Sequence, residues 1–171
     1  MNFKCWLEAA ESSVSRLSQM AVANGWKYEP VTLGREINPK SVSVGSVVYP
    51  TLVNQDGVMI ALDVMDRYKH SGRILLGDYL DVSPNRVTLA AIITPGENRK
   101  RGMGSKALQQ LQTFADNLGI VIVGEPVQMK QFKNKESLTT KQLIKWYKKH
   151  GWKQRIEGDD SILEYRPSLP A

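Results

Sequence analysis

Apolar residues recur at every third or fourth position near the start of the chain, and this spacing predicts an amphipathic helix. The helix is expected over residues 2–23, and Gly25 directly after it is a residue type that commonly ends helices. The apolar positions of the expected buried face are Phe3, Leu7, Ala10, Val14, Leu17 and Ala21.

From residue 45 to residue 95 the pattern changes to short apolar or alternating runs that turn-forming residues separate. Such a pattern is typical of strands joined by tight turns, and it predicts an antiparallel meander of about four strands. The expected strands cover residues 46–52, 58–64, 73–80 and 86–94.

The following part of the chain predicts a strand, loop, helix and strand over residues 86–123. One apolar helix face ends at Gly119, and the fully apolar run 120–123 follows at once. A fully apolar run suits a strand buried on both faces, here parallel to the strand before the helix. The apolar positions of the helix are Ala107, Leu108, Leu111, Phe114, Ala115 and Leu118.

The last predicted unit covers residues 139–165. Residues 139–142 can cap a second helix, Gly151 ends it, and residues 161–165 form a final strand. Together the elements predict one domain over residues 1–171. Its expected fold is α/β of the α+β type, with a mixed, largely antiparallel central sheet flanked by helices.

Composition agrees with a single folded domain. The chain has 171 residues, of which 42% are hydrophobic and 23% charged, enough to bury one core. Cys5 is the single cysteine, which excludes a disulfide framework and a cysteine-based zinc site, so no metal is expected. Neither a signal peptide nor a membrane-spanning run is recognisable, so the expected location is the cytoplasm and no membrane partner is expected.

The charge is unevenly distributed. The net charge is +6, yet residues 126–155 alone contain nine Lys or Arg and one acid, Glu136. This basic block, which also contains Phe132, Trp146, Tyr147 and Trp152, could bind nucleic acid or an acidic protein. The competing explanation is that part of it contacts a phosphate-bearing ligand and the rest is a solvated helix face.

The loop over residues 94–106 has the chemistry of an anion site. Gly102 and Gly104 allow a tight turn, and the first amides of the following helix have no partner within the helix. The helix dipole adds partial positive charge at the same point. Phosphate or pyrophosphate is therefore the favoured ligand, and the loop adds the cations Arg99, Lys100, Arg101 and Lys106.

Two familiar phosphate loops fit poorly. A Walker A loop ends in Gly-Lys-Ser or Gly-Lys-Thr, whereas this chain has Gly104-Ser105-Lys106. A dinucleotide fingerprint could read Gly102-x-Gly104-x-x-Ala107, with Glu125 about 20 residues further on. That fingerprint begins directly after its strand, but here residues 95–101 intervene.

From about residue 44 onward the chain resembles the GNAT superfamily of N-acetyltransferases, and two motifs carry the likeness. The first, Arg99-x-x-Gly102-x-Gly104, is similar to the family's pyrophosphate loop. The second, Tyr147-x-x-x-Gly151-Trp152, is similar to a segment near the family's C-terminus. They occur in the expected order, each on the expected element.

The resemblance implies that acetyl-CoA is the acyl donor and that the backbone amides of residues 101–106 hold its pyrophosphate. Backbone donors near the end of the preceding strand would polarise the thioester carbonyl. Thr140 stands where the family often has an Asn that contacts pantetheine. The cofactor contacts implied in this way are Ile92, Ile93, Thr94, Arg99, Lys100, Arg101, Gly102, Met103, Gly104, Ser105, Lys106 and Thr140.

The same resemblance makes Tyr147 the general acid, which would protonate the departing thiolate. The alternative is that Tyr147 is a core-facing residue of its helix. Glu125 is the candidate general base, because it follows a strand at a place where many such enzymes carry a carboxylate. Ordered water could serve instead, and the rival carboxylates are Asp78, Asp81 and Glu97.

His70 and His150 are expected at the surface, since no carboxylate is placed beside either. Direct transfer is favoured over a covalent route because Cys5 is remote from both motifs in sequence.

Two functions from different classes follow. The first is transfer of an acetyl group to a primary amine on a protein, an aminoacyl-RNA or a small molecule. The alternative is a binding module with this fold that uses the basic block for nucleic acid or an acidic protein. Residues 1–8 also resemble the starts of many tailed-phage proteins, which suggests a phage source.

Overall fold

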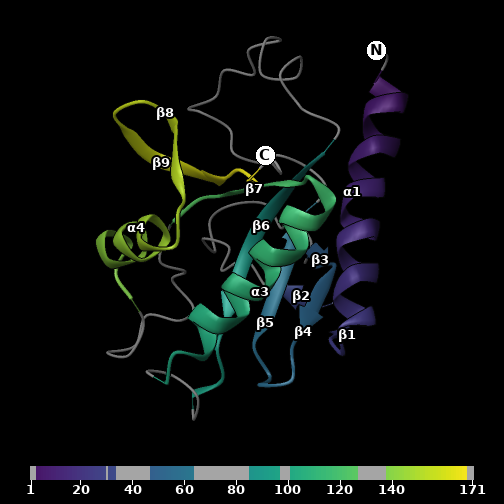
Figure 1. Ribbon diagram of the computed structural model, residues 1–171, viewed down its shortest axis with the longest axis horizontal. Helices are drawn as coiled ribbons and strands as arrows, with labels where there is room; N and C mark the ends of the chain where they lie inside the picture. The colour runs from purple at the N-terminus through teal and green to yellow at the C-terminus, as the bar shows by residue number, and fades with distance from the viewer. Residues whose placement is uncertain are drawn as a thin grey trace, which may run out of the picture.

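The computed structural model describes residues 3–29, 31–33, 47–63, 85–96, 101–126 and 138–168. In these ranges the chain forms three helices, which lie around a central sheet (Figure 1). The helices are α1 (Phe3–Ala23), α3 (Met103–Leu118) and α4 (Thr140–Lys149). The strands are β1 (Lys27–Tyr28), β2 (Val31–Leu33), β3 (Val47–Tyr49), β4 (Thr51–Val53), β5 (Met59–Asp63), β6 (Arg86–Ile93), β7 (Val121–Gly124), β8 (Lys153–Ile156) and β9 (Asp159–Tyr165).

Seven strands form the central sheet in the order β1-β4-β5-β6-β7-β9-β8. Neighbouring strands are antiparallel except β6 and β7, which are parallel and are joined through α3. The sheet is therefore mixed and largely antiparallel, and it contains the predicted β-loop-α-β unit. The fold-class prediction is confirmed.

Proline divides one predicted strand into two. Residues 46–52 were expected to form a single strand, but Pro50 separates β3 from β4, and β3 pairs with β2 in a separate two-stranded sheet. Proline has no backbone N–H for a strand ladder, so the chain changes sheets at this position. β1, β2 and β8 were not predicted, and the strand expected over residues 73–80 lies outside the described residues.

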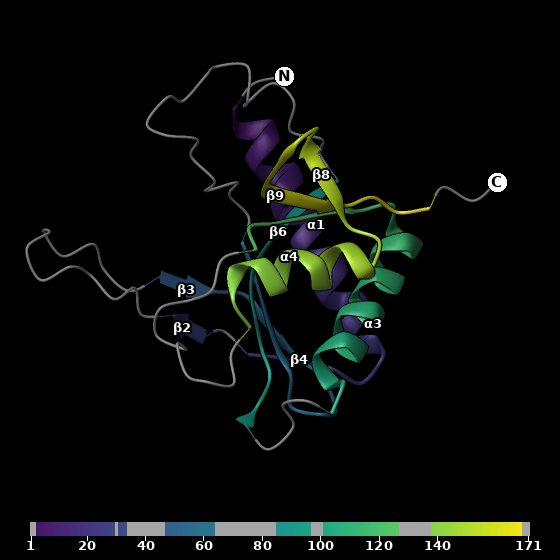
Figure 2. The ribbon, with the colours of Figure 1, turned by 90° about the vertical axis from the view of Figure 1, so that its left-hand side faces the viewer.

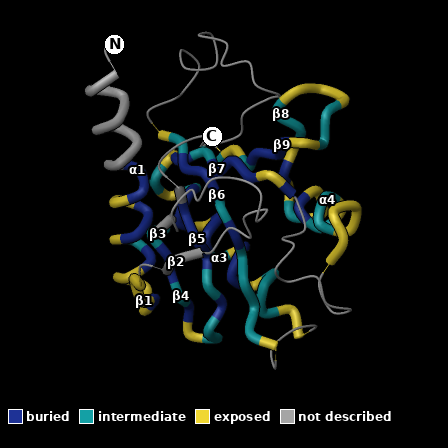
Figure 3. Tube along the Cα trace, turned by 180° about the vertical axis from the view of Figure 1, so that it is seen from behind, coloured by how far each residue is buried: buried dark blue, intermediate teal, exposed yellow. Residues whose placement is uncertain are grey.

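α1 and α3 lie side by side over one face of the sheet, as Figures 1 and 2 show. The predicted apolar faces meet there, because Leu17 of α1 and Leu111 of α3 are fully buried in the same core cluster. Arg16 also donates to the Leu118 carbonyl at the end of α3. Figure 3 shows the resulting core as the dark-blue strands and helix faces at the centre of the molecule.

Helix ends agree with the predicted caps. Gly25, Gly119 and Gly151 all have positive φ, the conformation in which glycine commonly ends a helix. Thr139 forms a capping box with Gln142 at the start of α4. Thr140 is therefore the first helical residue and not the cap.

A hydrogen-bonded clasp joins the end of β9 to α3. The Tyr165 hydroxyl donates to Asp116, at 2.8 Å from Oδ1, and the Ser168 amide donates to the same carboxylate. Burial and the bond to Asp116 raise the pKa of Tyr165 to about 12.

This raised pKa predicts a loss of stability at high pH. An unfolded tyrosine ionises near its ordinary pKa of 10, while folded Tyr165 stays protonated, so the free energy of unfolding should fall between about pH 10 and pH 12. Urea unfolding across this range should show a smaller fall in Tyr165→Phe than in the wild type. Tyr28→Phe, at an exposed tyrosine, is the control and should keep the wild-type slope. Equal slopes in all three proteins would contradict the prediction.

Candidate functional site

The start of α3, where the sequence predicts an anion site, has no side-chain cap among the described residues. Gly102 precedes the helix with φ 75°. The Gly102 carbonyl accepts from Lys106, which fixes the first turn. Amides in this turn precede the first intrahelical donor, so they can bind phosphate oxygens.

Gly104 lets this turn approach the end of β6. A Cβ atom at Gly104 would lie 3.0 Å from Thr94 Oγ1, tighter than ordinary van der Waals contact. Thr94 directly follows β6, and Gly104 is in the first turn of α3. The loop between β6 and α3 therefore begins and ends near the same point. Because Gly104 has no side chain, the end of β6 and the start of α3 can lie this close together.

The strands β6 and β7 part before β6 reaches this turn. Their parallel pairing ends at Leu89 and Gly124, whereas β6 continues to Ile93 along β5. Ala61 pairs with Ala91 and Leu62 with Leu89, so Ala90 is the extra residue of a β-bulge. Bulges redirect backbone groups and are common beside active sites.

This divergence begins earlier than the sequence suggested. Backbone donors were expected around residues 92–94, but β7 no longer accompanies β6 from Ala90 onward. Two of the expected cofactor contacts lie on opposite faces of the sheet. Ile92 packs against the main core, and Ile93 packs against a small cluster that contains Ala91. Alternation along a strand places adjacent side chains on opposite faces of the sheet.

α4 contacts the start of α3 through two side chains. Trp146 Nε1 donates to Ser105 Oγ at 2.9 Å, and His150 Nε2 lies 3.2 Å from the same oxygen. The two rings also meet edge to face, with centroids 5.2 Å apart. Ser105, an expected cofactor contact, is therefore held by α4.

A chain of aromatic rings connects α4 to the point where the strands part. Tyr147 packs on Trp152 with ring centroids 4.8 Å apart, and a Cβ at Gly124 would lie 3.3 Å from the Trp152 ring. Trp152 is 2% exposed and Tyr147 8% exposed. Tyr147 thus lies on the core-facing side of α4, one ring away from the last paired residue of β7.

The remaining predicted cofactor contacts differ in their surroundings. Arg101 and Gly102 are exposed, Met103 is half-buried against the core, and Lys106 forms a 3.0 Å ion pair with Asp56. Part of the charge expected at the loop is therefore already paired. Thr140 is exposed at the start of α4. Arg99 and Lys100 lie outside the described residues.

Among the candidate bases, Glu125 is exposed directly after β7, beside the divergence. The rivals Asp78, Asp81 and Glu97 lie outside the described residues, as does His70.

Glu164 is the buried carboxylate among the described residues, and it lies next to Leu163, the partner of Gly124. Its Oε1 accepts from Arg166 at 2.6 Å, and its Oε2 lies 3.9 Å from Arg86. Because this carboxylate is buried and its Oε1 is already bound to Arg166, it is poorly placed to accept a proton from a substrate amine.

His150 is the main residue that sequence reasoning misplaced. It was expected at the surface, but it is half-buried against Ser105. Burial, and then the charge of Lys149, lower the pKa of His150 below 6.5. The helical spacing of residues 143, 146, 147 and 150 could have indicated this inward face.

The described part of the basic block is partly neutralised. Lys148 forms a 2.6 Å ion pair with Asp160, and hydrogen bonds from Lys148 and Gln154 lower the pKa of Asp160. Lys141, Lys145 and Lys149 remain exposed on α4. Residues 127–137 of the block lie outside the described residues.

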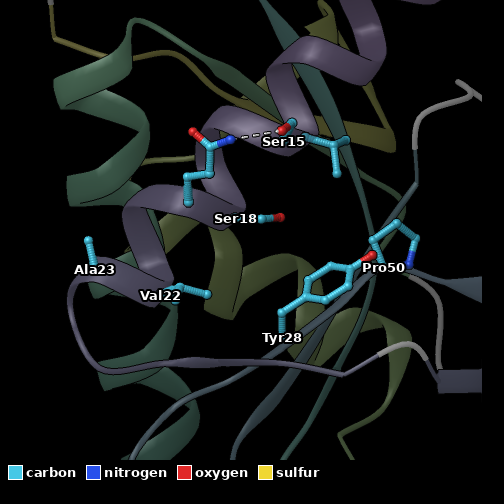
Figure 4. A pocket seen from close by; sticks show the side chains of 8 residues that line it. Ser15, Ser18, Val22, Ala23, Tyr28 and Pro50 are labelled. Carbon is cyan, nitrogen blue, oxygen red and sulfur yellow. Dashed lines mark hydrogen bonds between the residues drawn. The ribbon is translucent and has the colours of Figure 1, made fainter.

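A cavity of about 620 Å³ lies elsewhere, between α1 and the edge of the sheet. Figure 4 shows its lining, with Ser18 and Val22 on α1 facing Tyr28 and Pro50. Figures 1 and 3 place α1 on the opposite side of the molecule from α4. This cavity is therefore separate from the site at the start of α3.

The described residues contain neither a candidate metal site nor a helix that could span a membrane. No group of three or more His, Cys, Asp or Glu side chains there could hold a metal ion. None of the helices in these ranges is both long and apolar enough to cross a membrane.

Comparison with known proteins returned likenesses in solved structures alone. No protein-family model and no curated protein matches the sequence. The ribosomal-protein-S18-alanine N-acetyltransferase from Escherichia coli matches with a TM-score of 0.40 and 14% identity, over 100% of this chain and 93% of that one. The anti-CRISPR protein AcrVA5 matches with a TM-score of 0.40 and 11% identity, over 67% of this chain and 88% of that one.

Proposed function

We propose that this chain is a GNAT-type N-acetyltransferase that transfers an acetyl group from acetyl-CoA to a primary amine. One observation carries the proposal: α4 joins the uncapped start of α3, through Trp146, to the point where β6 and β7 part, through Tyr147 and Trp152. An anion site and a gap in a sheet are thus brought together at one helix. A ligand with a phosphate end and a long, thin acyl-bearing arm suits both features.

The residues fit acetyl-CoA as the donor. Amides in the first turn of α3 can hold its pyrophosphate, with Gly102 supplying the turn and Ser105 a hydroxyl. The pantetheine arm would then follow the side of β6 that β7 leaves after Leu89. Backbone N–H groups near the Ala90 bulge would polarise the thioester carbonyl as negative charge develops on its oxygen.

Transfer requires a bond from the amine nitrogen to the carbonyl carbon and cleavage of the carbon–sulfur bond. The amine must lose a proton, to Glu125 or to water that Glu125 orients, while the thiolate gains a proton from Tyr147. Tyr147 then recovers a proton from solvent. The exposure of Glu125 suits contact with water, and the burial of Tyr147 suits a fixed position for its hydroxyl.

Calorimetric titration with acetyl-CoA tests donor binding. We expect micromolar affinity and a rise in melting temperature, because the ligand binds the folded state. Gly102→Ala should weaken binding about ten-fold, since a left-handed conformation at a non-glycine residue costs about 1–2 kcal/mol and shifts the helix start. Gly96→Ala is the matched control in the same loop: its Cβ meets no atom within 4 Å, so affinity should not change.

Release of the coenzyme A thiol in the presence of primary amines tests transfer. The panel should contain peptides with free N-termini, lysine-containing peptides, polyamines and aminoacyl-RNA. Acetyl-CoA binding together with amine-dependent thiol release supports the enzyme. No stabilisation by acetyl-CoA, with salt-sensitive binding to nucleic acid instead, would replace it by the binding-module alternative.

A further inference from the structure

The Ser105 hydroxyl is fixed from two sides by α4. An indole nitrogen is a donor and never an acceptor, so the 2.9 Å bond from Trp146 Nε1 occupies one lone pair of Ser105 Oγ. The second contact, from His150 Nε2 at 3.2 Å, can run in either direction. The direction of this hydrogen bond determines whether the Ser105 hydroxyl offers a donor or a lone pair to a ligand at the start of α3.

Two arrangements are possible. When His150 Nε2 carries a proton, as it does in the imidazolium and in one of the two neutral tautomers, it donates to Ser105 Oγ, and the hydroxyl hydrogen is left to donate to a ligand. When Nε2 is bare, the hydroxyl donates to it, and a lone pair of Ser105 is left to face the ligand. A phosphate oxygen accepts hydrogen bonds, so it selects the first arrangement.

The backbone holds the His150 ring in this position. The His150 carbonyl accepts from Gln112 Nε2 at 2.7 Å, and its amide donates to the Tyr147 carbonyl at 2.9 Å. Neither bond involves the imidazole. A substitution of the side chain therefore leaves the backbone at residue 150 anchored to α3.

Burial and the charge of Lys149 favour neutral imidazole at residue 150 until an anion arrives. Lys148 and Lys149 lie on α4, and Arg101 and Lys106 lie at the start of α3. Asp160 is bound to Lys148 and Asp56 to Lys106. A bound pyrophosphate would bring negative charge to the first turn of α3, next to the Ser105 hydroxyl, and would favour the protonated ring.

We propose that His150 is a positioning residue for the donor: by carrying a proton at Nε2, it makes the Ser105 hydroxyl a hydrogen-bond donor to a phosphate group at the start of α3. The inference rests on the proposed function, because the phosphate is that of acetyl-CoA. The negative charge of the bound pyrophosphate also favours the imidazolium over both neutral tautomers. Binding of the donor is therefore coupled to uptake of a proton by His150, and affinity rises as pH falls.

Calorimetry with dephospho-coenzyme A between about pH 5.5 and pH 8 tests this coupling. That ligand keeps the pyrophosphate but lacks the 3′-phosphate, which has its own ionisation in this range. We expect the wild-type Kd to be about ten-fold higher at the upper end, as for a one-unit change in the pKa of His150 on binding. Repetition in buffers of different ionisation enthalpy should show proton uptake.

Substitutions at residue 150 separate positioning from packing. His150→Gln supplies a permanent N–H donor, so it should bind tightly at every pH. His150→Phe keeps a ring but no donor, so its Kd should be about ten-fold higher and independent of pH. Ser105→Ala should weaken binding about as much, and adding His150→Phe to it should change little. His70→Gln, at the other histidine of the chain, should behave as the wild type.

The outcomes distinguish the two proposals. A Kd in His150→Phe equal to that of the wild type overturns the role of His150 while the acetyltransferase proposal stands. A pH-independent wild-type Kd, or pH dependence retained in His150→Phe, overturns the proton coupling. Absence of any acetyl-CoA binding overturns the proposed function and this inference together. The wild-type pH profile needs no substitution, so the test does not depend on whether a variant folds.

Discussion

Tyr147→Phe is expected to lower kcat for acetyl transfer by at least about ten-fold and to leave KM for acetyl-CoA nearly unchanged. Phenylalanine keeps the ring contacts with Trp146 and Trp152, at centroid distances of 4.9 and 4.8 Å, so the helix should stay in place. The hydroxyl alone is lost, and with it the proton for the departing thiolate. Steady-state thiol release with the best amine of the panel measures the effect.

Tyr28→Phe is the matched control, because Tyr28 is an exposed tyrosine on β1, at the opposite edge of the sheet from β8 and β9. Its kcat should equal the wild-type value. An unchanged kcat in Tyr147→Phe would remove Tyr147 from the mechanism and leave it as a packing residue. A rise in KM with unchanged kcat would mean that the hydroxyl contributes to donor binding instead.

Trp152→Ala is expected to reduce the free energy of unfolding by about 3–5 kcal/mol, the usual range for removal of a buried aromatic side chain. Trp152 is 2% exposed and fills the space between Gly124, Tyr147 and Tyr165. Removal of the indole ring would also leave the Tyr147 ring without its packing partner. The kcat of the protein that remains folded should therefore fall. Urea unfolding and thiol release measure the two effects.

Trp26→Ala separates these effects. Trp26 is 3% exposed and packs edge to face on Phe114, so its removal should destabilise the chain by a similar amount. It lies between α1 and β1, away from α4, and kcat of the folded protein should be kept. If both substitutions lower kcat equally, the link between Trp152 and Tyr147 is refuted.

The elements that depend on local pattern could be predicted from the sequence. The apolar stripes of α1 and α3, the cap at Thr139 and the glycine that ends each helix follow from residue spacing and backbone preference over a few positions. The β-loop-α-β unit was also predictable, because a fully apolar run after a helix suits a buried parallel strand. The two motifs located the loop and Tyr147 on these elements, and whether each acts as proposed is for the experiments above.

Pairings between distant positions could not be predicted in the same way. Ser105 and His150 are 45 residues apart, and neither carries a pattern that names the other as its partner. The bulge at Ala90 depends on the register between β5 and β6, which no property of Ala90 specifies. Pro50 shows the opposite case, since a single residue with no N–H ends a strand that hydrophobic alternation alone would continue.

Periodicity and residue type along the chain were therefore sufficient for the helices, the parallel strand pair and the glycine turn at the start of α3, because those depend on neighbours in sequence. The inward position of His150, the contact of Trp152 with Gly124 and the early separation of β6 from β7 required the folded chain. These features arise where α3, α4 and the sheet pack together, and side-chain packing is set by three-dimensional contact and not by sequence distance.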